Sequence, residues 1–266
     1  MATQTRDFAI VWDLKTDKEY RRLSTGKIPG FQGIFKVQVK FSPDGDRLIS
    51  ATDAIRVWDL EKKQLIKRIL PTNEMIFDLA VSPNGKSLAY CEQMQIEGNV
   101  RVVDLATFKE KYVIPQKTRV MFSPNGNLLA TSGGRRVTLW EPTSGKEIYS
   151  LQLPMIPATI CFSPDSWTLA IGCNNLPNTE SRLVFWDLRK NEYRTFTDVQ
   201  APVRRLEFSP DGKILTCYKM DDTTFRDAIT GKILGVAKNL ALRPILLVGN
   251  SLRSADTTLV CSKPPV

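Results

Sequence analysis

The sequence predicts an all-β protein of the β-propeller class, because two short motifs alternate along the chain at a period near 40 residues. The first motif is Ser-Pro-Asp/Asn-Gly or a near copy, at Ser42–Gly45, Ser82–Gly85, Ser123–Gly126, Ser163–Ser166 and Ser209–Gly212. The second is Trp-Asp or a degraded copy, at Trp12-Asp13, Trp58-Asp59, Val103-Asp104, Trp140-Glu141, Trp186-Asp187 and Arg226-Asp227. The serines that open the first motif are 40, 41, 40 and 46 residues apart. This spacing is typical of propeller blades with four strands each.

The unit from Ile34 to Leu70 shows how the strands follow one another. Residues 37–41 alternate between apolar and polar side chains, which is the period of a β-strand. Ser-Pro-Asp-Gly then forms a turn in which proline fixes φ and Gly45 adopts a positive φ. Residues 48–51, 55–60 and 64–69 are predicted as the next three strands. We label the four strands of a blade a to d, from the inside outward.

A single four-stranded unit cannot bury both of its faces, so the units are expected to stack beside one another in a ring. The tryptophans that end strand c are predicted to fill the gaps between adjacent sheets. Trp167 differs because it lies in an a–b turn, where the other units carry glycine and a polar residue. We therefore expect Trp167 to be exposed.

These paired motifs, and c–d turns such as Asp227-Ala-Ile-Thr-Gly-Lys232, resemble the WD-repeat β-propeller family from about Thr5 to about Val260. Members of that family often carry Gly-His before strand a, and this histidine joins Asp, Ser and Trp in a hydrogen-bonded network. The present chain contains no histidine, so that network cannot form. Val103 and Arg226 also replace two of the tryptophans. We therefore expect looser units, held mainly by packing.

We predict one domain over residues 1–266, with repeat units at roughly 1–26, 34–70, 72–114, 116–153, 155–197, 199–238 and 241–266. Six blades of four antiparallel strands are favoured, the last blade being shared between the chain ends. In that arrangement residues 8–14 and 19–23 supply strands c and d, while residues 244–248 and 252–255 supply strands a and b. Strand b near Arg253 then pairs with strand c near Ile10. A seven-bladed or truncated ring is the alternative, with residues 1–5 ending a strand b and residues 257–260 as a surplus strand c.

The chain carries a net charge of +9 from 37 basic and 28 acidic residues, and much of the basic excess lies on predicted c–d turns and outer strands. Cations on an outer strand discourage edge-to-edge pairing. The alternative interpretation is a surface for RNA, a ribonucleoprotein or an anionic membrane. The five cysteines are an odd number without metal-ligand spacing, which predicts reduced thiols in a cytoplasmic protein. Neither a leader nor a stretch of 18 apolar residues is recognised, so secretion and membrane spanning are not expected.

Catalysis is not expected. Without histidine the chain has no histidine-based general base, triad or metal cluster. It also lacks a Gly-x-Ser-x-Gly elbow and a phosphate-binding Gly-x-x-x-x-Gly-Lys-Ser/Thr loop. We predict no cofactor and no metal. An enzyme would need an unrecognised carboxylate or thiol site.

Binding is expected on the top face, which carries the b–c and d–a loops, because the loops of that face vary most in length. The two long b–c loops, and one d–a loop, offer apolar side chains beside polar ones, as protein-recognition surfaces do. The candidate protein-binding residues are Phe31, Gln93, Met94, Ile96, Asn175, Leu176 and Pro177. The alternative is that these loops are tolerated insertions.

A second set of polar residues lies four positions before the serine of each first motif, on predicted strand a, and should face the central channel: Gln38, Asp78, Arg119, Thr159 and Arg205. A solvated channel lining explains them without a ligand, whereas the two arginines are suited to an acidic side chain or a phosphate. The sequence thus predicts a non-catalytic WD-repeat scaffold that binds partner proteins. The partner's identity stays open, and docking on nucleic acid or anionic lipid is the alternative.

Overall fold

The computed structural model describes residues 2–4, 8–13, 15–24, 38–52, 54–69, 75–94, 97–175, 180–199, 201–238, 245–248 and 251–254. All the regular structure within these residues is β-strand. The chain divides into two compact units, residues 1–120 with residues 243–266, and residues 121–242. Each unit is described by itself.

The first unit contains four sheets among its described strands. A three-stranded sheet comprises β1 (Ala2–Gln4), β2 (Phe8–Asp13) and β3 (Lys18–Ser24). One four-stranded sheet comprises β4 (Gln38–Phe41), β5 (Arg47–Ala51), β6 (Ile55–Asp59) and β7 (Gln64–Ile69). Another comprises β8 (Met75–Val81), β9 (Ser87–Met94), β10 (Glu97–Asp104) and β11 (Glu110–Ile114), and a two-stranded sheet comprises β24 (Ile245–Val248) and β25 (Ser251–Ser254).

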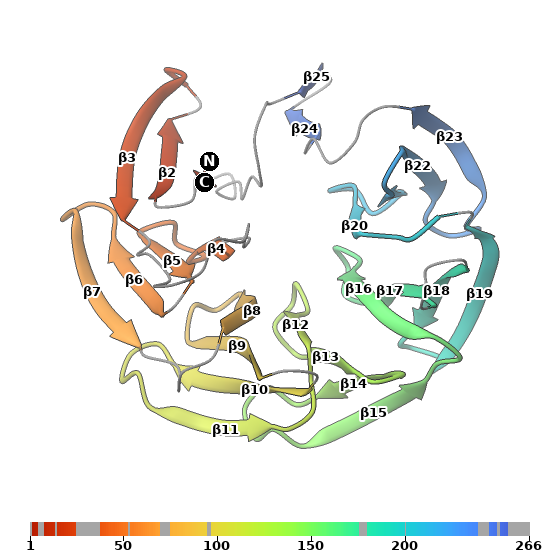
Figure 1. Cartoon of the computed structure of the whole chain (residues 1–266), viewed down its shortest axis with the longest axis horizontal. Coiled ribbons are helices and arrows are strands. Elements are labelled where there is room, and N and C mark those ends of the chain that lie inside the picture. The colour runs from red at the N-terminus through yellow and green to blue at the C-terminus, as the bar shows by residue number, and fades with distance from the viewer. Residues whose placement is uncertain are drawn as a thin grey trace. The chain divides into compact units, whose positions relative to one another are not determined.

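The second unit contains three four-stranded sheets, whose outer strands β15, β19 and β23 are visible in Figure 1. The first comprises β12 (Arg119–Phe122), which begins just before the division, β13 (Leu129–Gly133), β14 (Arg136–Trp140) and β15 (Glu147–Gln152). The second comprises β16 (Ile156–Phe162), β17 (Thr168–Asn174), β18 (Ser181–Asp187) and β19 (Glu192–Val199). The third comprises β20 (Arg205–Phe208), β21 (Ile214–Tyr218), β22 (Asp222–Asp227) and β23 (Ile233–Lys238).

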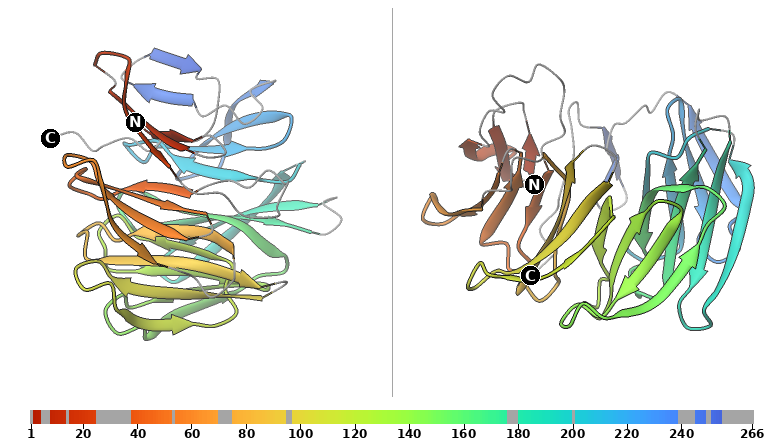
Figure 2. Two further views of the ribbon diagram at one scale, coloured as in Figure 1. Left: turned by 60° about the vertical axis from the view of Figure 1, so that its left-hand side comes forward. Right: turned by 60° about the horizontal axis from the view of Figure 1, so that its bottom comes forward.

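The predicted plan of four antiparallel strands in chain order is confirmed in five sheets of the described chain (Figure 2). The unit at residues 34–70 illustrates the agreement, because its predicted strands match β4 to β7 within about one residue at each end. The all-β propeller class is therefore correct.

The pairing at the chain ends differs from the prediction. Ile10 of β2 pairs with Thr3 of β1, and not with the strand that contains Arg253. Both edges of β2 are thus occupied, one by β1 and the other by β3. The sheet β1–β3 already contains three strands. A blade shared between the chain ends would therefore need a single further strand, paired with β1, and not the predicted pair of strands next to β2. The surplus strand considered for residues 257–260 lies outside the described residues.

The five a–b turns share one pattern of hydrogen bonds, which explains their sequence. In each turn the serine hydroxyl donates to the carboxylate or amide oxygen two residues later, as from Ser209 to Asp211 at 2.6 Å. The same hydroxyl accepts the N–H five residues on, as from Ile214 at 2.9 Å. The fourth copy has Ser166 in place of glycine, at a φ of 66°. Its hydroxyl accepts the N–H of Asn125 in the preceding sheet at 3.0 Å, so this departure from the motif links two blades.

The tryptophans of strand c keep polar partners although the chain lacks histidine. Trp58 Nε1 donates to Ser50 Oγ at 3.3 Å, and Trp140 Nε1 donates to Thr131 Oγ1 at 2.8 Å. The acidic residue that follows each tryptophan caps the c–d turn, as Asp187 does by accepting the N–H of Arg189 at 2.9 Å. Part of the expected network therefore persists, and the units are not held by packing alone.

Apolar cores lie between adjacent sheets. In the second unit one cluster combines Leu139 and Leu151 of one sheet with Phe162, Ile171 and Trp186 of the next. Trp186 is 1% exposed, as an interblade residue should be. Trp167 is 43% exposed, which confirms the expectation for that turn, and the Arg189 guanidinium lies 4.8 Å from the centre of its ring.

Arg226 takes the place of a tryptophan and is fully buried, at 2% exposed. Its guanidinium forms a bidentate pair with Asp198 of the neighbouring outer strand, at 2.9 and 3.1 Å, and it also donates to the Gly231 carbonyl at 3.0 Å. The Phe196 ring packs against Gly231, where a Cβ would lie 2.2 Å from ring atoms. The residue interpreted as a sign of a looser unit is thus a link between two sheets.

Substitution of Asp198 by alanine is expected to cost about 2–3 kcal/mol in the free energy of unfolding. The loss arises because a buried guanidinium is left without its counter-charge, and it is reduced because Asp198 itself is half exposed. A second change, Arg226→Met, removes the stranded charge, so the double variant should be more stable than Asp198→Ala alone. Urea unfolding of both variants measures this difference. If the double variant lost the sum of the two single losses, the link between Arg226 and Asp198 would be contradicted.

Candidate functional site

The structure describes only part of the predicted top-face surface. Phe31, Ile96, Leu176 and Pro177 lie outside the described residues. Gln93 and Met94 are the last residues of β9, and only their backbone is described. Asn175 is exposed, and its N–H donates to the Glu180 carbonyl at 3.0 Å across the base of the loop. The described residues thus establish how the two long loops are anchored.

The stem of the loop at 175–180 is anchored to the next blade through Asn174. Its side-chain nitrogen donates to the Val203 carbonyl at 3.2 Å, and its oxygen accepts the Val203 N–H at 3.1 Å. Ser181 Oγ donates to the same oxygen at 3.2 Å. Gly172 permits this approach, because a Cβ there would lie 2.8 Å from Thr159 and 2.9 Å from Val203. The loop therefore starts from a fixed base that joins two sheets.

The stem of the other long loop, at 93–98, is anchored in the same way to the connection between β11 and β12. Lys117 N–H donates to the Gly98 carbonyl at 2.7 Å, and Cys91 Sγ lies 3.0 Å from the Lys117 carbonyl oxygen. A Cβ at Gly98 would lie 2.9 Å from that oxygen and 2.4 Å from the Glu92 carbonyl. In both units, then, a long b–c hairpin is tied to the d–a connection that follows it.

The candidate channel residues of the first unit link neighbouring inner strands. Gln38 Nε2 of β4 donates to the Phe77 carbonyl of β8 at 3.5 Å. Asp78 Oδ2 of β8 accepts the Val120 N–H of β12 at 3.1 Å. Burial raises the pKa of Asp78, while the nearby charges of Arg119 and Lys40 oppose the rise. Arg119 thus lies within electrostatic reach of a carboxylate of its own chain.

A pH dependence follows from Asp78. Because its pKa is raised in the folded state, the folded chain binds more protons than the unfolded chain above pH 3.8, the ordinary value. The contribution of Asp78 to the free energy of unfolding therefore falls as pH rises from there toward neutrality. We expect the free energy of unfolding of Asp78→Asn, relative to that of the wild type, to be higher at pH 7 than at pH 5, as measured by urea unfolding. An equal difference at both pH values would show that Asp78 is already ionised at pH 5.

The two candidate channel residues of the second unit differ in their surroundings. Thr159 packs its methyl group close to Gly172, beneath the Asn174 anchor. Arg205 pairs with Glu207 on the same strand, and its guanidinium lies 5.7 Å from the centre of the Tyr218 ring. Tyr218 in turn donates its hydroxyl to Glu207 at 2.9 Å, and burial raises the pKa of that phenol. The Arg205 charge is therefore already balanced within the chain.

Met220 is an exposed top-face residue that the sequence reasoning missed. It lies in the short b–c loop between β21 and β22, and its side chain is 56% exposed. Arg204, also exposed, places a guanidinium nitrogen 3.2 Å from the Met220 sulfur. Length does not distinguish this loop, because it is as short as most b–c loops of the chain. An apolar residue between Lys219 and Asp221 is the signal that could have found it.

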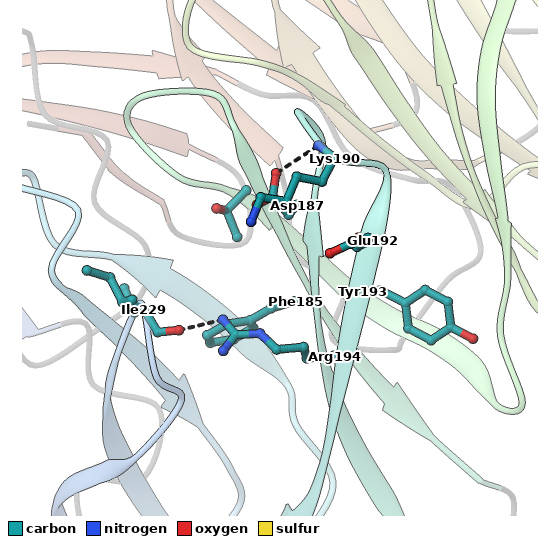
Figure 3. Close-up of a pocket in the computed structure, with 9 residues that line it drawn as sticks. Phe185, Asp187, Lys190, Glu192, Tyr193, Arg194 and Ile229 are labelled. Carbon is teal, nitrogen blue, oxygen red and sulfur yellow. Dashed lines mark hydrogen bonds between the residues drawn. The ribbon is translucent and has the colours of Figure 1, made fainter.

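A pocket of about 460 Å³ lies at the opposite, turn-bearing face of the second unit (Figure 3). Its lining residues are Thr168, Phe185, Asp187, Lys190, Glu192, Tyr193, Arg194, Ala228 and Ile229. Arg194 donates to the Ile229 carbonyl and so joins the outer strand of one blade to the c–d turn of the next. The sequence does not single out these residues, because Asp227–Lys232 has the pattern of an ordinary c–d turn.

No group of three or more potential metal ligands occurs within the described residues. The four cysteines in the described segments form no disulfide with one another. Burial raises the pKa of Cys173 and of Cys217 to about 12, so both thiols are protonated at neutral pH. The described part of the chain includes no helix capable of spanning a membrane.

Comparisons with known proteins agree with the repeat analysis. Residues 108–141 match the model of the WD domain, G-beta repeat. The small ribosomal subunit protein RACK1y of rice is 34% identical over 39% of this chain and 32% of its own length. The protein LST8 homolog of Drosophila melanogaster is 28% identical over 65% of this chain and 57% of its own length. The matched regions thus span less than two thirds of either relative.

Solved structures also share the fold. A chain of the Kuenenia stuttgartiensis hydrazine synthase superposes on 82% of this chain with a TM-score of 0.64 and 18% sequence identity, which shows similarity of fold alone. Repeated motifs, four-stranded sheets in chain order and the matching relatives all point to the same family. The fold is therefore that of a β-propeller, and its repeats resemble those of the WD-repeat family, with divergent units that contain no histidine.

Proposed function

We propose that this chain is a non-catalytic scaffold that binds partner proteins through the b–c and d–a loops of its top face. The observation that supports the proposal is the anchoring of both long b–c hairpins. Asn174 ties one stem to Val203, and Gly98 ties the other to Lys117. A loop on a fixed base loses less conformational freedom when it binds a partner. The anchoring therefore favours loops that recognise a partner over loops that are insertions without a role.

The name of one relative supports the same proposal. RACK1y of rice is named as a small ribosomal subunit protein, which makes it a component of a larger assembly. We infer that the present chain likewise acts as part of an assembly, and we place it in the cytoplasm, where thiols such as Cys173 and Cys217 stay reduced.

Docking on a ribonucleoprotein is the second candidate. It is favoured by the net charge of +9 and by exposed cations on outer strands, such as Lys67 and Arg68 of β7. Binding of this kind is dominated by phosphate contacts and falls by orders of magnitude between about 50 and 200 mM salt. Protein recognition by apolar loop residues depends far less on salt.

The test is capture of partners by the tagged full chain from a cell lysate, with and without nuclease, at low and high salt. One variant shortens Gln93–Glu97 to a tight turn, and a second shortens residues 175–179 while keeping Asn174. Each should fold normally, with an unchanged melting temperature, and should lose most of the captured protein. Lys62→Ala combined with Lys109→Ala, on exposed c–d turns, is the matched control and should capture as the wild type does.

Retention of the same partners by both shortened variants would contradict the proposal for the top-face loops. Loss of all capture after nuclease treatment would favour the ribonucleoprotein candidate instead.

A further inference from the structure

β23 differs from the other outer strands in carrying almost no charge. The outer strands of the other complete sheets each contain at least one charged residue before their final position: Lys67 and Arg68 in β7, Glu110 and Lys111 in β11, Glu147 in β15, and Glu192, Arg194 and Asp198 in β19. β23 reads Ile-Leu-Gly-Val-Ala before it ends at Lys238. Charged residues are the usual protection of an edge strand against pairing with another chain, and β23 has one only at its final position.

The apolar side chains of β23 are also exposed. Leu234 is 56% exposed and Val236 is 52% exposed, with Ile233 partly exposed beside them. A Cβ built on Gly235 would meet no described atom within 4 Å. β23 pairs with β22 on one side and is the last strand of its sheet (Figure 1). Within the described residues, therefore, its second edge offers backbone donors and acceptors next to an apolar strip.

The charges at the two ends of β23 indicate what pairs with it. Lys232 precedes the strand and Lys238 ends it, and both are exposed. If a second copy of this chain paired antiparallel about Gly235, each Lys232 would lie opposite a Lys238. Like charges directly opposite one another destabilise a strand pair, so a second copy is disfavoured. A strand with acidic residues at both ends complements the two lysines.

We propose that β23 is a docking edge for an extended segment of a partner protein, with an apolar, β-branched centre and acidic residues at its ends. The segment adds a fifth strand to the sheet β20–β23. Backbone hydrogen bonds supply the affinity, Leu234 and Val236 contact alternate side chains, and Lys232 and Lys238 fix the register. This site is separate from the top-face loops and does not depend on them.

The experiment measures binding of a fluorescent probe peptide to the full chain by anisotropy. In the probe, Val-Thr repeats lie between two pairs of glutamates. A second peptide carries lysines in place of the glutamates, and two others carry N-methyl groups on alternate amides, in either phase. The protein variants are Leu234→Lys with Val236→Lys, and Ile148→Lys as the matched control on the charged outer strand β15, where Ile148 is likewise exposed.

The acidic probe is expected to bind, and the lysine peptide to bind about tenfold or more weakly, a difference of about 1.4 kcal/mol. At least one N-methylated peptide should lose binding, because it cannot complete the ladder of backbone hydrogen bonds. The β23 double variant should lose binding while the β15 variant and both shortened top-face variants keep it. Thermal melts of the variants establish that they are folded.

Several outcomes overturn the proposal. These are no binding of the acidic probe, equal binding of the acidic and lysine peptides, full binding of both N-methylated peptides, or equal loss in the β15 control. Self-association abolished by the β23 double variant, seen by sedimentation, would assign the edge to a second copy instead.

Discussion

Replacement of Trp186 by alanine is expected to lower the free energy of unfolding by about 3–5 kcal/mol. Trp186 is 1% exposed, and it packs in a cluster formed by two sheets of the second unit. Alanine would leave a cavity between those sheets, because neighbours from two blades cannot both move inward to fill it. The substitution would also leave the Asn191 side-chain oxygen without the indole N–H that it accepts at 3.0 Å. Urea unfolding followed by circular dichroism measures the loss.

Trp167→Ala is the matched control for that experiment, because the same side chain is removed from an exposed turn. We expect a loss below about 1 kcal/mol, since substitutions of exposed residues seldom cost more. Trp58 is half-buried, so the loss in free energy of unfolding for Trp58→Ala should lie between those for Trp186→Ala and Trp167→Ala. Similar losses at Trp186 and Trp167 would show that the cost does not come from the interblade core.

Deletion of residues 1–25 is expected to destabilise the chain by an amount on the order of 5 kcal/mol, which corresponds to a fall in melting temperature of roughly 10–20 °C. The deleted sheet supplies Ala9, Val11 and Leu23, which form one core cluster with Val39 and Leu48 of the next sheet. Burial of each large apolar side chain is worth about 1.5–3 kcal/mol, and the deletion exposes both sides of the cluster. Differential scanning calorimetry of the shortened chain measures the change.

Point variants on β3 keep this prediction testable if the deletion prevents folding. Leu23 is buried, and Leu23→Ala should cost about 2–5 kcal/mol. Tyr20 on the same strand is exposed, so Tyr20→Ala should change the free energy of unfolding by no more than about 0.5 kcal/mol. An unchanged melting temperature for both the deletion and Leu23→Ala would mean that residues 1–25 are a tail.

The sequence predicted the blades well because each blade is a local structure. The turn motif, the alternation of residues 37–41 and the Trp-Asp motif all act within one unit, so each can be recognised without knowing the partners. The pairing of the chain ends could not be predicted in the same way. β2 has two edges, and nothing in the short segment Ala2–Gln4 distinguishes it from the strand near Arg253 as a partner.

The sites were harder to predict because they depend on contacts between blades. Arg226 looks like a lost tryptophan in the sequence, whereas its partner Asp198 lies 28 residues away on another sheet. Asn174 directly precedes the candidate residue Asn175 and looks like part of the same loop in the sequence, yet it ends β17 and anchors that loop to Val203. The unusual character of β23 was visible as a run without charges, but its significance depends on exposure. Single residues that join two units carry no periodic signal.

The pairing of strands has a consequence for how the chain folds. Within the described residues every sheet joins strands that follow one another in sequence, so each forms over short chain separations. Repeat arrays can begin to fold at any unit and grow from it. The polar links between blades, such as those of Asp78 with Val120 and Arg226 with Asp198, can form only after both sheets exist. We therefore expect blades to appear one after another during synthesis, with these links closing each new junction.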